Sequence, residues 1–333
     1  MCATDNNQSD PMKPKIILTR RWPEQVEQVL QAHYDCEFNS ADAPFSGRQL
    51  QDALTRADAI LSTVTDRFDA AVLGAANCRT TVIANFGVGF SHIDINAAKA
   101  ANITVTNTPD VLSDCTADLA MTLLLMAARR AGEGERELRT NAWEGWRPTH
   151  LMGTKVTGKK LGIIGFGRIG RAMAHKAHHG FAMDILVHNR SAVPTTSLAQ
   201  VNAVQVESIE ALLAESDFVS LHCPGGDENK HLLNNDRIAN MKPGSFLINT
   251  ARGEVIDEDA LINALQNGPI AGAGLDVFNN EPAIDSRFKT FSNAVLLPHL
   301  GSATTETRND MGMRVVTNLN AFFAGDTPPD KVV

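Results

Sequence analysis

Three polar residues that lie far apart in the sequence each follow a predicted strand and could act together on one small substrate. Arg252 follows the apolar stretch 245–249, and Glu281 and His299 each come just after a later predicted strand. An arginine can bind a carboxylate through two parallel hydrogen bonds and polarise the adjacent C=O bond. Histidine is a natural general acid near neutral pH, and a nearby glutamate favours the protonated ring. A single glutamate in a loop is usually only solvated and a single histidine is more often structural, but the three residues together predict hydride transfer to a 2-oxo acid.

The cofactor for such a transfer is indicated by residues 161–170, LGIIGFGRIG, in which an apolar strand leads into a Gly-x-Gly-x-x-Gly turn. A helical pattern follows at 171–177. In this turn the first glycine allows the tight bend, the second lets the backbone approach a pyrophosphate, and the third lets helix and strand pack closely. The helix N-terminus offers free N–H groups to the phosphates. The segment therefore predicts a dinucleotide site formed by Gly165, Phe166, Gly167, Arg168, Ile169 and Gly170.

The strand expected next, over 184–191, ends in residues that bear on the choice between NAD and NADP. An NAD site usually carries a carboxylate about 20 residues beyond the glycine turn, where it accepts a hydrogen bond from the ribose 2′-hydroxyl. This chain has Asn189, Arg190 and Ser191 there. No carboxylate repels a 2′-phosphate at this position, and the Arg190 guanidinium could pair with one. The segment favours NADPH, with NADH as the alternative cofactor; a solvated Arg190 without this role is the competing interpretation.

Length and composition restrict the class of protein. The 333 residues suggest about two domains, and the net charge of −8 argues against binding to nucleic acid or an acidic membrane. The longest apolar run, near 119–128, is too short to span a bilayer, and the polar tail 1–12 lacks a signal core and is expected to be disordered. Five scattered cysteines without a C-x-x-C pair predict reduced thiols in the cytoplasm and no metal site: Cys2, Cys36, Cys78, Cys115 and Cys223.

Strand-like and helix-like segments alternate along the whole chain. Such alternation predicts an α/β fold with parallel sheets and helices on both faces. The glycine turn begins in the middle of the chain, so a separate α/β unit precedes it, and the long apolar helix links the two. Expected strands are 15–19, 59–62, 81–84, 103–107, 161–164, 184–191, 218–222, 245–249, 272–277 and 294–298. Expected helices are 24–32, 94–101, 114–130, 171–177, 208–215, 235–241, 257–266 and 307–323.

With these motifs in view, the chain resembles the D-isomer-specific 2-hydroxyacid dehydrogenases, and most closely their glyoxylate/hydroxypyruvate reductase branch. The resemblance covers roughly residues 15–323. The motifs that carry it are Gly87-Val88-Gly89 with His92-Ile93-Asp94, Thr108–Leu112, Gly165–Gly170, Asn249–Gly253, Gly274–Pro282 and Pro298–Thr304. The loop 225–229, Gly-Gly-Asp-Glu-Asn, departs from the threonine-rich form common in relatives.

The resemblance implies roles for individual residues. Arg252, Glu281 and His299 match the catalytic arginine, glutamate and histidine of the family. Val88 and Gly89 match the backbone donors that bind the substrate carboxylate together with Arg252. The remaining cofactor contacts that it implies are Cys223 and Pro224 around the adenosine, Asp276 at the nicotinamide amide, and Thr250, Ala251, His299 and Gly301.

The same resemblance implies a Rossmann coenzyme domain, 111–303, inserted into a flavodoxin-like substrate domain formed by 1–110 and 304–333. It also implies a homodimer with a dimerisation arm near 135–155, from which Trp146 would reach the substrate of the neighbouring subunit. The activity expected is reduction of small 2-oxo acids such as glyoxylate and hydroxypyruvate.

Other readings of the chain stay open at this point. They are another D-2-hydroxyacid dehydrogenase, a phosphite dehydrogenase, or a nucleotide-sensing binding module like the co-repressors that share this fold. A formate dehydrogenase would resemble a Gln–His pair where this chain has Glu281 and His299.

Overall fold

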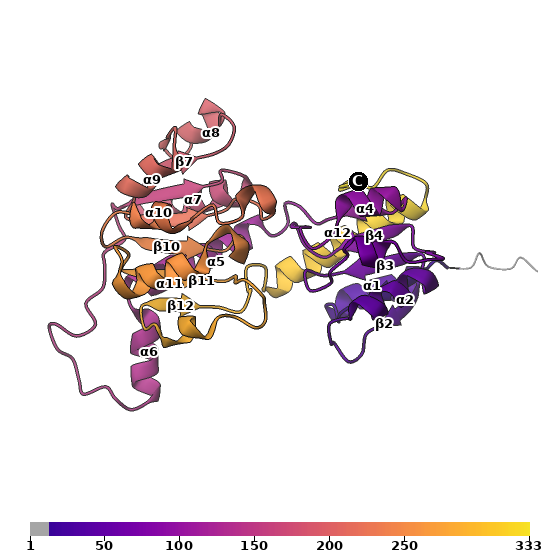
Figure 1. Cartoon of the computed structure of the whole chain (residues 1–333), viewed down its shortest axis with the longest axis horizontal. Helices are drawn as coiled ribbons and strands as arrows, with labels where there is room; N and C mark the ends of the chain where they lie inside the picture. The colour runs from indigo at the N-terminus through magenta and orange to yellow at the C-terminus, as the bar shows by residue number, and fades with distance from the viewer. Residues whose placement is uncertain (1–12) are drawn as a thin grey trace, which may run out of the picture. The chain divides into compact units, whose positions relative to one another are not determined.

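The computed structural model describes residues 13–333, so the tail 1–12 that the sequence predicts to be disordered lies outside the described residues. The chain folds into two compact units (Figure 1). The first unit runs up to Val111 and is completed by Thr305–Val333, and the second unit is Leu112–Thr304. The polypeptide therefore passes from one unit to the other twice.

A five-stranded parallel sheet forms the centre of the first unit. Its strands are β1 (Lys15–Leu18), β2 (Asp35–Phe38), β3 (Ala59–Ser62), β4 (Val82–Asn85) and β5 (Thr104–Thr106). They lie in the order β2-β1-β3-β4-β5, which is the order of flavodoxin-like folds. The central strands β3 and β4 are buried along their whole length, as expected for parallel strands that helices cover on both faces.

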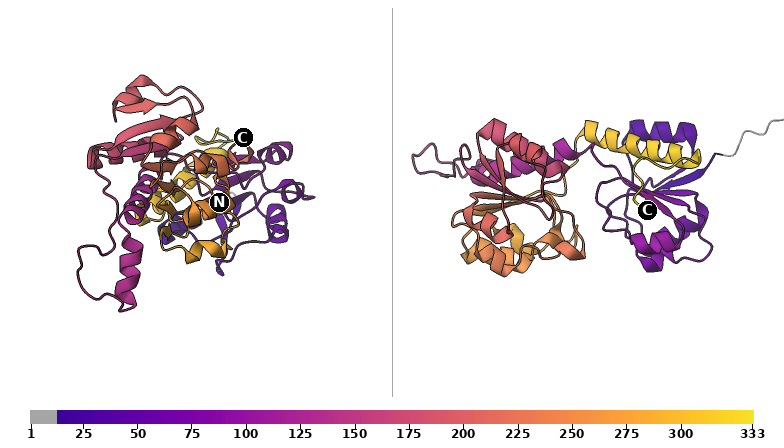
Figure 2. Two further views of the ribbon diagram at one scale, coloured as in Figure 1. Left: turned by 60° about the vertical axis from the view of Figure 1, so that its left-hand side comes forward. Right: turned by 90° about the horizontal axis from the view of Figure 1, so that it is seen from above.

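Helices cover both faces of this sheet. They are α1 (Glu24–His33), α2 (Gly47–Arg56), α3 (Ala70–Leu73), α4 (Ile95–Ala100) and α12 (Thr305–Phe323). α1 and α12 pack together on one face, and α2, α3 and α4 lie on the other (Figure 2). Gly312 allows the close approach of α12, because a Cβ at this position would lie 2.5 Å from Cγ2 of Val26. The C-terminal helix is thus an integral part of the first unit.

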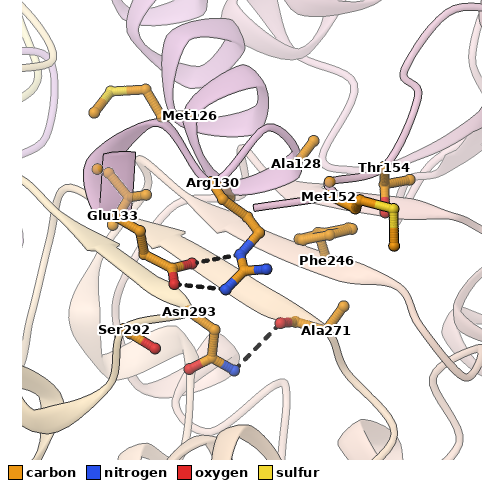
Figure 3. A pocket seen from close by; sticks show the side chains of 14 residues that line it. Met126, Ala128, Arg130, Glu133, Met152, Thr154, Phe246, Ala271, Ser292 and Asn293 are labelled. Atoms are coloured by element: carbon orange, nitrogen blue, oxygen red, sulfur yellow. Dashed lines mark hydrogen bonds and ion pairs between the residues drawn. The ribbon is translucent and has the colours of Figure 1, made fainter. Parts of the chain in front are cut away.

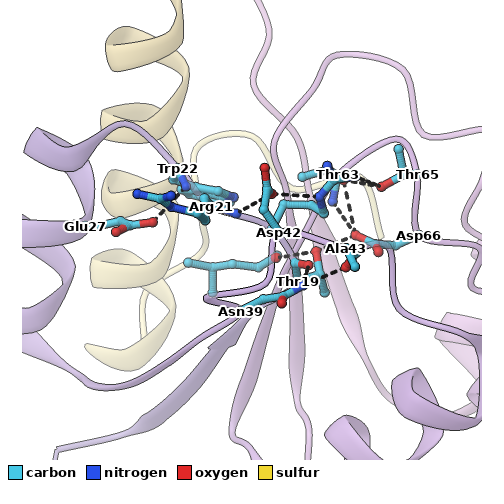
Figure 4. Close-up of polar contacts among 12 residues, drawn as sticks. Thr19, Arg21, Trp22, Glu27, Asn39, Asp42, Ala43, Thr63, Thr65 and Asp66 are labelled. Carbon is cyan, nitrogen blue, oxygen red and sulfur yellow. Dashed lines mark hydrogen bonds and ion pairs between the residues drawn. The ribbon is translucent and has the colours of Figure 1, made fainter.

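Polar side chains join the carboxyl ends of β1 and β3, between which the direction of the strand order reverses (Figure 4). Asp66 is fully buried and accepts hydrogen bonds from the Thr19 hydroxyl and the Thr63 N–H. Asn39 donates to the carbonyl of Thr19 at 2.7 Å. Ligands of open α/β sheets usually bind at such a reversal point. Here side chains of the protein occupy much of this point, although Oδ1 of Asp66 has no hydrogen-bond partner among the described residues.

A seven-stranded parallel sheet forms the centre of the second unit. Its strands are β6 (Lys160–Ile164), β7 (Asp184–His188), β8 (Ala203–Gln205), β9 (Phe218–Leu221), β10 (Phe246–Asn249), β11 (Gly272–Leu275) and β12 (Ala294–Leu296). Their order is β12-β11-β10-β9-β6-β7-β8. Numbered from β6, the first six strands have the Rossmann order 3-2-1-4-5-6, and β12 extends the sheet beyond the sixth. The carboxyl ends of β10, β11 and β12 are therefore neighbours.

Helices pack on the two faces of the larger sheet and create two apolar cores. The helices are α5 (Ser113–Ala128), α6 (Ala131–Arg139), α7 (Arg168–Phe181), α8 (Thr195–Ala199), α9 (Ile209–Glu215), α10 (Asn235–Ala239) and α11 (Glu258–Asn267), with short 3-10 turns at Asp227–Asn229, Gly253–Val255 and Ser286–Thr290. α5 and α7 cover one face, and α9, α10 and α11 cover the other (Figure 2). None of the helices in the described chain is long and apolar enough to cross a membrane.

The predicted fold class is confirmed, but two element ends differ from the sequence prediction. The helix predicted over 114–130 ends at Ala128, because Arg130 adopts a left-handed conformation with φ of 53° before α6 begins. The strand predicted over 184–191 ends at His188, because the Asn189 side chain donates to the carbonyl of Ser191 and turns the chain.

Several short elements were absent from the sequence prediction. β2 and β8 are short and partly exposed, so they lack a clear apolar alternation. α2 and α6 are rich in polar residues, although Leu50, Ala53 and Leu54 give α2 a buried apolar face at helical spacing. α2 carried a local signal that was missed. Ser46 and Gln49 form a capping box in which each side chain bonds to the backbone of the other.

Candidate active site

A histidine and a glutamate from consecutive loops at the carboxyl edge of the larger sheet are hydrogen-bonded to each other. Nδ1 of His299 lies 2.8 Å from Oε2 of Glu281, and the two side chains are 32% and 33% exposed. The other oxygen of Glu281 accepts the N–H of Phe278 at 2.9 Å. Because the glutamate holds Nδ1, it orients the imidazole and leaves Nε2 as the ring nitrogen available for proton transfer. This arrangement suits a general acid that is both partly buried and accessible.

Arg252 enters the same region from the loop after β10. Asn249, the last residue of β10, accepts the N–H of Ala251 and donates to the carbonyl of Arg252, both at 2.9 Å. The next residue, Gly253, packs directly on the following loop, since a Cβ there would lie 2.1 Å from the carbonyl carbon of Phe278. Only glycine permits this backbone contact, and it brings the loop of Arg252 against the loop of Glu281.

The charges of these side chains influence one another. Burial raises the pKa of Glu281, but the hydrogen bond and charge of His299, the N–H of Phe278 and the charge of Arg252 together hold it below its usual value. Burial lowers the pKa of Arg252, and the carboxylates of Glu254 and Glu281 oppose this shift. The glutamate is therefore ionised near neutral pH and provides a fixed negative charge beside the imidazole and the guanidinium.

Asp276 holds the loop that carries His299. Its carboxylate is 1% exposed and accepts the N–H groups of Leu300 at 2.6 Å and Gly301 at 2.8 Å, and its own carbonyl accepts the N–H of His299 at 2.9 Å. Burial raises the pKa of Asp276 to about 6, against the effect of these donors and of His299. The family resemblance implies a contact of Asp276 with the nicotinamide amide, and no local pattern in the sequence indicates this anchoring contact.

The loop at residues 87–89 carries Val88 and Gly89, the predicted substrate contacts of the first unit. All three of its carbonyls accept internal hydrogen bonds: Asn85 Nδ2 donates to Gly87 and Gly89 at 3.0 Å, and Asn107 Nδ2 donates to Val88 at 2.9 Å. Among the residues that the structure describes, the N–H groups of Val88 and Gly89 donate no hydrogen bond. The loop is thus a preformed turn with two unused donors, which is the chemistry that an anionic group requires.

The glycine turn has the shape that a dinucleotide pyrophosphate needs. Gly165 has φ of 93°, and a Cβ there would lie 2.6 Å from the backbone nitrogen of Cys223. Gly170 is packed under the turn, where a Cβ would lie 2.2 Å from the carbonyl oxygen of Gly165. A Cβ on Gly167 would meet nothing within 4 Å, and no side chain caps the N-terminus of α7. The space in front of this helix end therefore fits a phosphate group.

The remaining predicted cofactor contacts lie around the same edge. Asn189 Oδ1 accepts the N–H of Phe166 at 3.1 Å, which ties the end of β7 to the glycine turn. Arg190 is 85% exposed and pairs with Glu228 at 2.5 Å. Burial raises the pKa of the Cys223 thiol to about 11, so this cysteine is an apolar wall element. The buried Thr250 hydroxyl has no partner among the described residues, which leaves it available to a ligand.

Two predicted substrate contacts, Val88 and Gly89, belong to the first unit, and the other predicted site residues belong to the second. Trp146 lies in the extended segment after α6 and is 83% exposed. In the described part of the chain, no group of three or more His, Cys, Asp or Glu side chains is arranged to hold a metal ion.

A cavity of about 320 Å³ lies at the opposite edge of the larger sheet (Figure 3). Phe246 and Asn293, near the amino ends of β10 and β12, line it. Arg130 and Glu133 also line it and satisfy each other through two hydrogen bonds of 2.9 and 2.8 Å. Ligands of parallel sheets bind at the carboxyl edge, so this cavity is separate from the candidate active site.

Comparison with known proteins agrees with the geometry. The sequence model of the family described as "D-isomer specific 2-hydroxyacid dehydrogenase, NAD binding domain" matches residues 121–301. The chain is 43% identical over 326 residues to a glyoxylate reductase of Thermococcus litoralis, covering 96% of this chain and 97% of the relative. It is 36% identical over 313 residues to a glycerate dehydrogenase of Hyphomicrobium methylovorum, covering 94% of this chain and 97% of the relative.

Among solved structures, the NADPH-dependent glyoxylate/hydroxypyruvate reductase of Sinorhizobium meliloti, in complex with NADP and malonate, matches with a TM-score of 0.85 at 32% identity. The match covers 96% of this chain and 97% of that one. The chain belongs to the D-isomer specific 2-hydroxyacid dehydrogenase family. It is an oxidoreductase of the 2-hydroxyacid dehydrogenase class, and its second unit contains the NAD(P)-binding domain of that family.

Proposed function

We propose that this protein reduces small 2-oxo acids, with glyoxylate and hydroxypyruvate as the preferred substrates, to the corresponding 2-hydroxy acids. The observation that carries the proposal is the hydrogen-bonded pair of His299 and Glu281 beside Arg252, on the same sheet edge as the glycine turn. The names of the relatives support the choice of substrates, since both glyoxylate reductases and a glycerate dehydrogenase match nearly the whole chain.

In this proposal each polar group has a separate task. The N–H groups of Val88 and Gly89 bind the substrate carboxylate, and the Arg252 guanidinium binds it too and polarises the 2-oxo group. A nicotinamide dinucleotide bound at the glycine turn supplies the hydride. His299 donates a proton from Nε2 to the substrate oxygen, and Glu281 orients the ring through its hydrogen bond to Nδ1. The buried Asp276 keeps the loop of His299 in place.

The test is to assay a panel of 2-oxo acids with NADPH and with NADH. Turnover is measured as the decrease in absorbance of the reduced nicotinamide. We expect turnover with glyoxylate and hydroxypyruvate to exceed turnover with 2-oxo acids that have bulkier side chains. A preference for a bulky 2-oxo acid would indicate another D-2-hydroxyacid dehydrogenase. A gain of reduced-nicotinamide absorbance with phosphite and NADP+ or NAD+, without turnover of any 2-oxo acid, would indicate phosphite oxidation. Nucleotide binding with no turnover of any of these compounds would support a nucleotide-sensing module and contradict the proposal.

We also propose that NADPH is the preferred cofactor and that Arg190 recognises its 2′-phosphate. The end of β7 carries no carboxylate, and Arg190 projects from it with 85% exposure. Asn189, the residue before Arg190, fixes the backbone around Arg190 because its side chain accepts the N–H of Phe166 and donates to the carbonyl of Ser191. A guanidinium held at this position matches the geometry of a phosphate.

Replacement Arg190→Ala should raise the Kd for NADPH by about tenfold and change the Kd for NADH by less than about twofold, because only NADPH carries the charge that Arg190 binds. Fluorescence titration of the protein with each cofactor measures both constants. Arg171→Ala, on the exposed surface of α7, is a control for the loss of one positive charge. Equal losses with both cofactors would contradict the assignment of Arg190.

A homodimer formed through the segment after α5 is a further part of the proposal. α6 and the loop after it project from the sheet of their unit (Figure 1). Four exposed large apolar side chains gather in this segment: Leu138, Trp143, Trp146 and Met152, which are 61%, 52%, 83% and 66% exposed. Exposed apolar side chains at such density usually mark an interface, and tryptophan is often its strongest contributor.

Replacement Trp146→Ala should weaken a dimer by about thirtyfold in its dissociation constant, as expected for loss of an interface tryptophan. Sedimentation equilibrium at several concentrations measures this constant. If Trp146 also contacts the substrate of the neighbouring subunit, the KM for glyoxylate rises under conditions where the dimer is intact. Val204→Ala, at a 58% exposed position outside the segment, is the matched control. A monomeric wild-type protein at micromolar concentration would refute the dimer.

A further inference from the structure

We propose that Glu228 opposes the binding of a 2′-phosphate and so limits the preference of the cofactor site for NADPH over NADH. The proposal rests on the dinucleotide site proposed above and adds a residue that determines its specificity. The residue that usually distinguishes NAD sites from NADP sites lies at the end of the second strand, which is β7 here. Glu228 lies outside that segment, 38 residues beyond Arg190.

The first observation is that Arg190 already has a partner. Its Nη1 lies 2.5 Å from Oε2 of Glu228, and the two side chains are 85% and 79% exposed. Any phosphate that pairs with Arg190 has to compete with this carboxylate. Exposed ion pairs are weak, typically changing an equilibrium by about fivefold or less. Glu228 therefore reduces the affinity for a 2′-phosphate without abolishing it.

The second observation is that the backbone of Glu228 is held in place. Glu228 lies in the short 3-10 turn Asp227–Asn229, directly after Gly226. The N–H of Gly226 donates to Glu254 Oε1, and Asn229 Nδ2 donates to the carbonyl of Pro224, both at 2.9 Å. Because both sides of the turn are fastened, Glu228 remains near Arg190 even when its side chain rotates.

The third observation is the charge balance of this corner. Arg190 contributes one positive charge and Lys230, which directly follows the turn, contributes another, while Glu228 and its neighbour Asp227 contribute two negative charges. A 2′-phosphate near neutral pH carries a charge of about −1.5 to −2 and is therefore repelled by a carboxylate. A ribose 2′-hydroxyl is neutral and can donate a hydrogen bond to one. Glu228 consequently disfavours NADPH and tolerates NADH, whereas Arg190 has the opposite preference.

The test compares Glu228→Gln with the wild-type protein by calorimetric titration of the full-length chain with 2′,5′-ADP and with 5′-AMP. These fragments report binding at the adenosine end, and neither depends on turnover. We expect 2′,5′-ADP to bind about two- to fivefold more tightly to Glu228→Gln, and 5′-AMP to change by less than about 1.5-fold. The gain should shrink as ionic strength rises, because the charges are exposed.

Asp227→Asn is the matched control, since it removes the same charge from the same turn without removing the partner of Arg190. An equal gain in Asp227→Asn would show that general charge, not the Arg190–Glu228 pair, sets the affinity. Unchanged 2′,5′-ADP affinity in Glu228→Gln would also overturn the proposal. Failure of the wild-type protein to reduce any 2-oxo acid would instead contradict the proposed substrate activity. The comparison of 2′,5′-ADP and 5′-AMP binding would still test the role of Glu228.

Discussion

Replacement of His299 by asparagine is expected to lower kcat for 2-oxo acid reduction by about 10²–10⁴-fold, the usual contribution of a positioned general acid. Asparagine fills similar space and can keep a hydrogen bond to Glu281, so the loop should stay folded. The asparagine amide is not acidic enough to transfer a proton to the substrate oxygen at neutral pH. Because the carboxylate of the substrate is bound by other groups in the proposed mechanism, KM should change far less than kcat. Steady-state kinetics with glyoxylate measures both parameters.

Two further variants make this result specific to the imidazole. His175→Asn, on the exposed surface of α7, should leave kcat unchanged and controls for the substitution itself. Glu281→Gln keeps the side-chain shape but removes the negative charge that the structure places 2.8 Å from His299. We expect its kcat to fall as well, but less than that of His299→Asn. Turnover within tenfold of wild type in His299→Asn would remove His299 from the proton-transfer role.

Replacement of Arg252 by alanine is expected to lower kcat/KM by about 10³-fold or more, with a lower kcat and a higher KM together. The reason is that the Arg252 guanidinium is proposed to bind the substrate carboxylate in the ground state and also to stabilise the developing charge on the substrate oxygen in the transition state. Loss of one hydrogen-bond donor to such a developing charge typically costs about 10²–10³ in kcat. Steady-state kinetics with glyoxylate measures the split between the two parameters, and a change in KM alone would limit Arg252 to substrate binding.

The structural role of the Arg252 side chain has to be separated from its chemical role. Its aliphatic part packs on the neighbouring loop, since a Cβ on Gly225 would lie 2.8 Å from Cγ of Arg252. Arg252→Lys keeps most of that packing and the charge but loses the two-pronged hydrogen bond. We expect the Tm of Arg252→Lys to equal that of the wild-type protein. We expect its kcat/KM to remain far below the wild-type value. Partial recovery of Arg252→Ala by added guanidinium would support the chemical role, and full activity of Arg252→Lys would exclude two-pronged binding.

The limits of sequence reasoning are visible at particular residues. The glycine turn was interpretable because its strand, turn and helix are contiguous, so local conformation and packing are encoded within about ten residues. The predicted end of α5 lies too far along the chain because Ala128, Arg129 and Arg130 are all acceptable in a helix, and no local pattern indicates the positive φ of Arg130. The strand β2 was missed because it is short and only partly buried at the edge of its sheet.

The amino-acid sequence by itself determined the α/β class, the dinucleotide turn and the set of residue types available for chemistry. These depend on periodicity and on contiguous motifs, which local forces specify. Only the tertiary structure decided which distant side chains pair: Asp276 with the loop of His299, and Arg190 with Glu228. Such pairs join loops that follow different strands, and their distances depend on strand order and loop shape, which no local pattern contains.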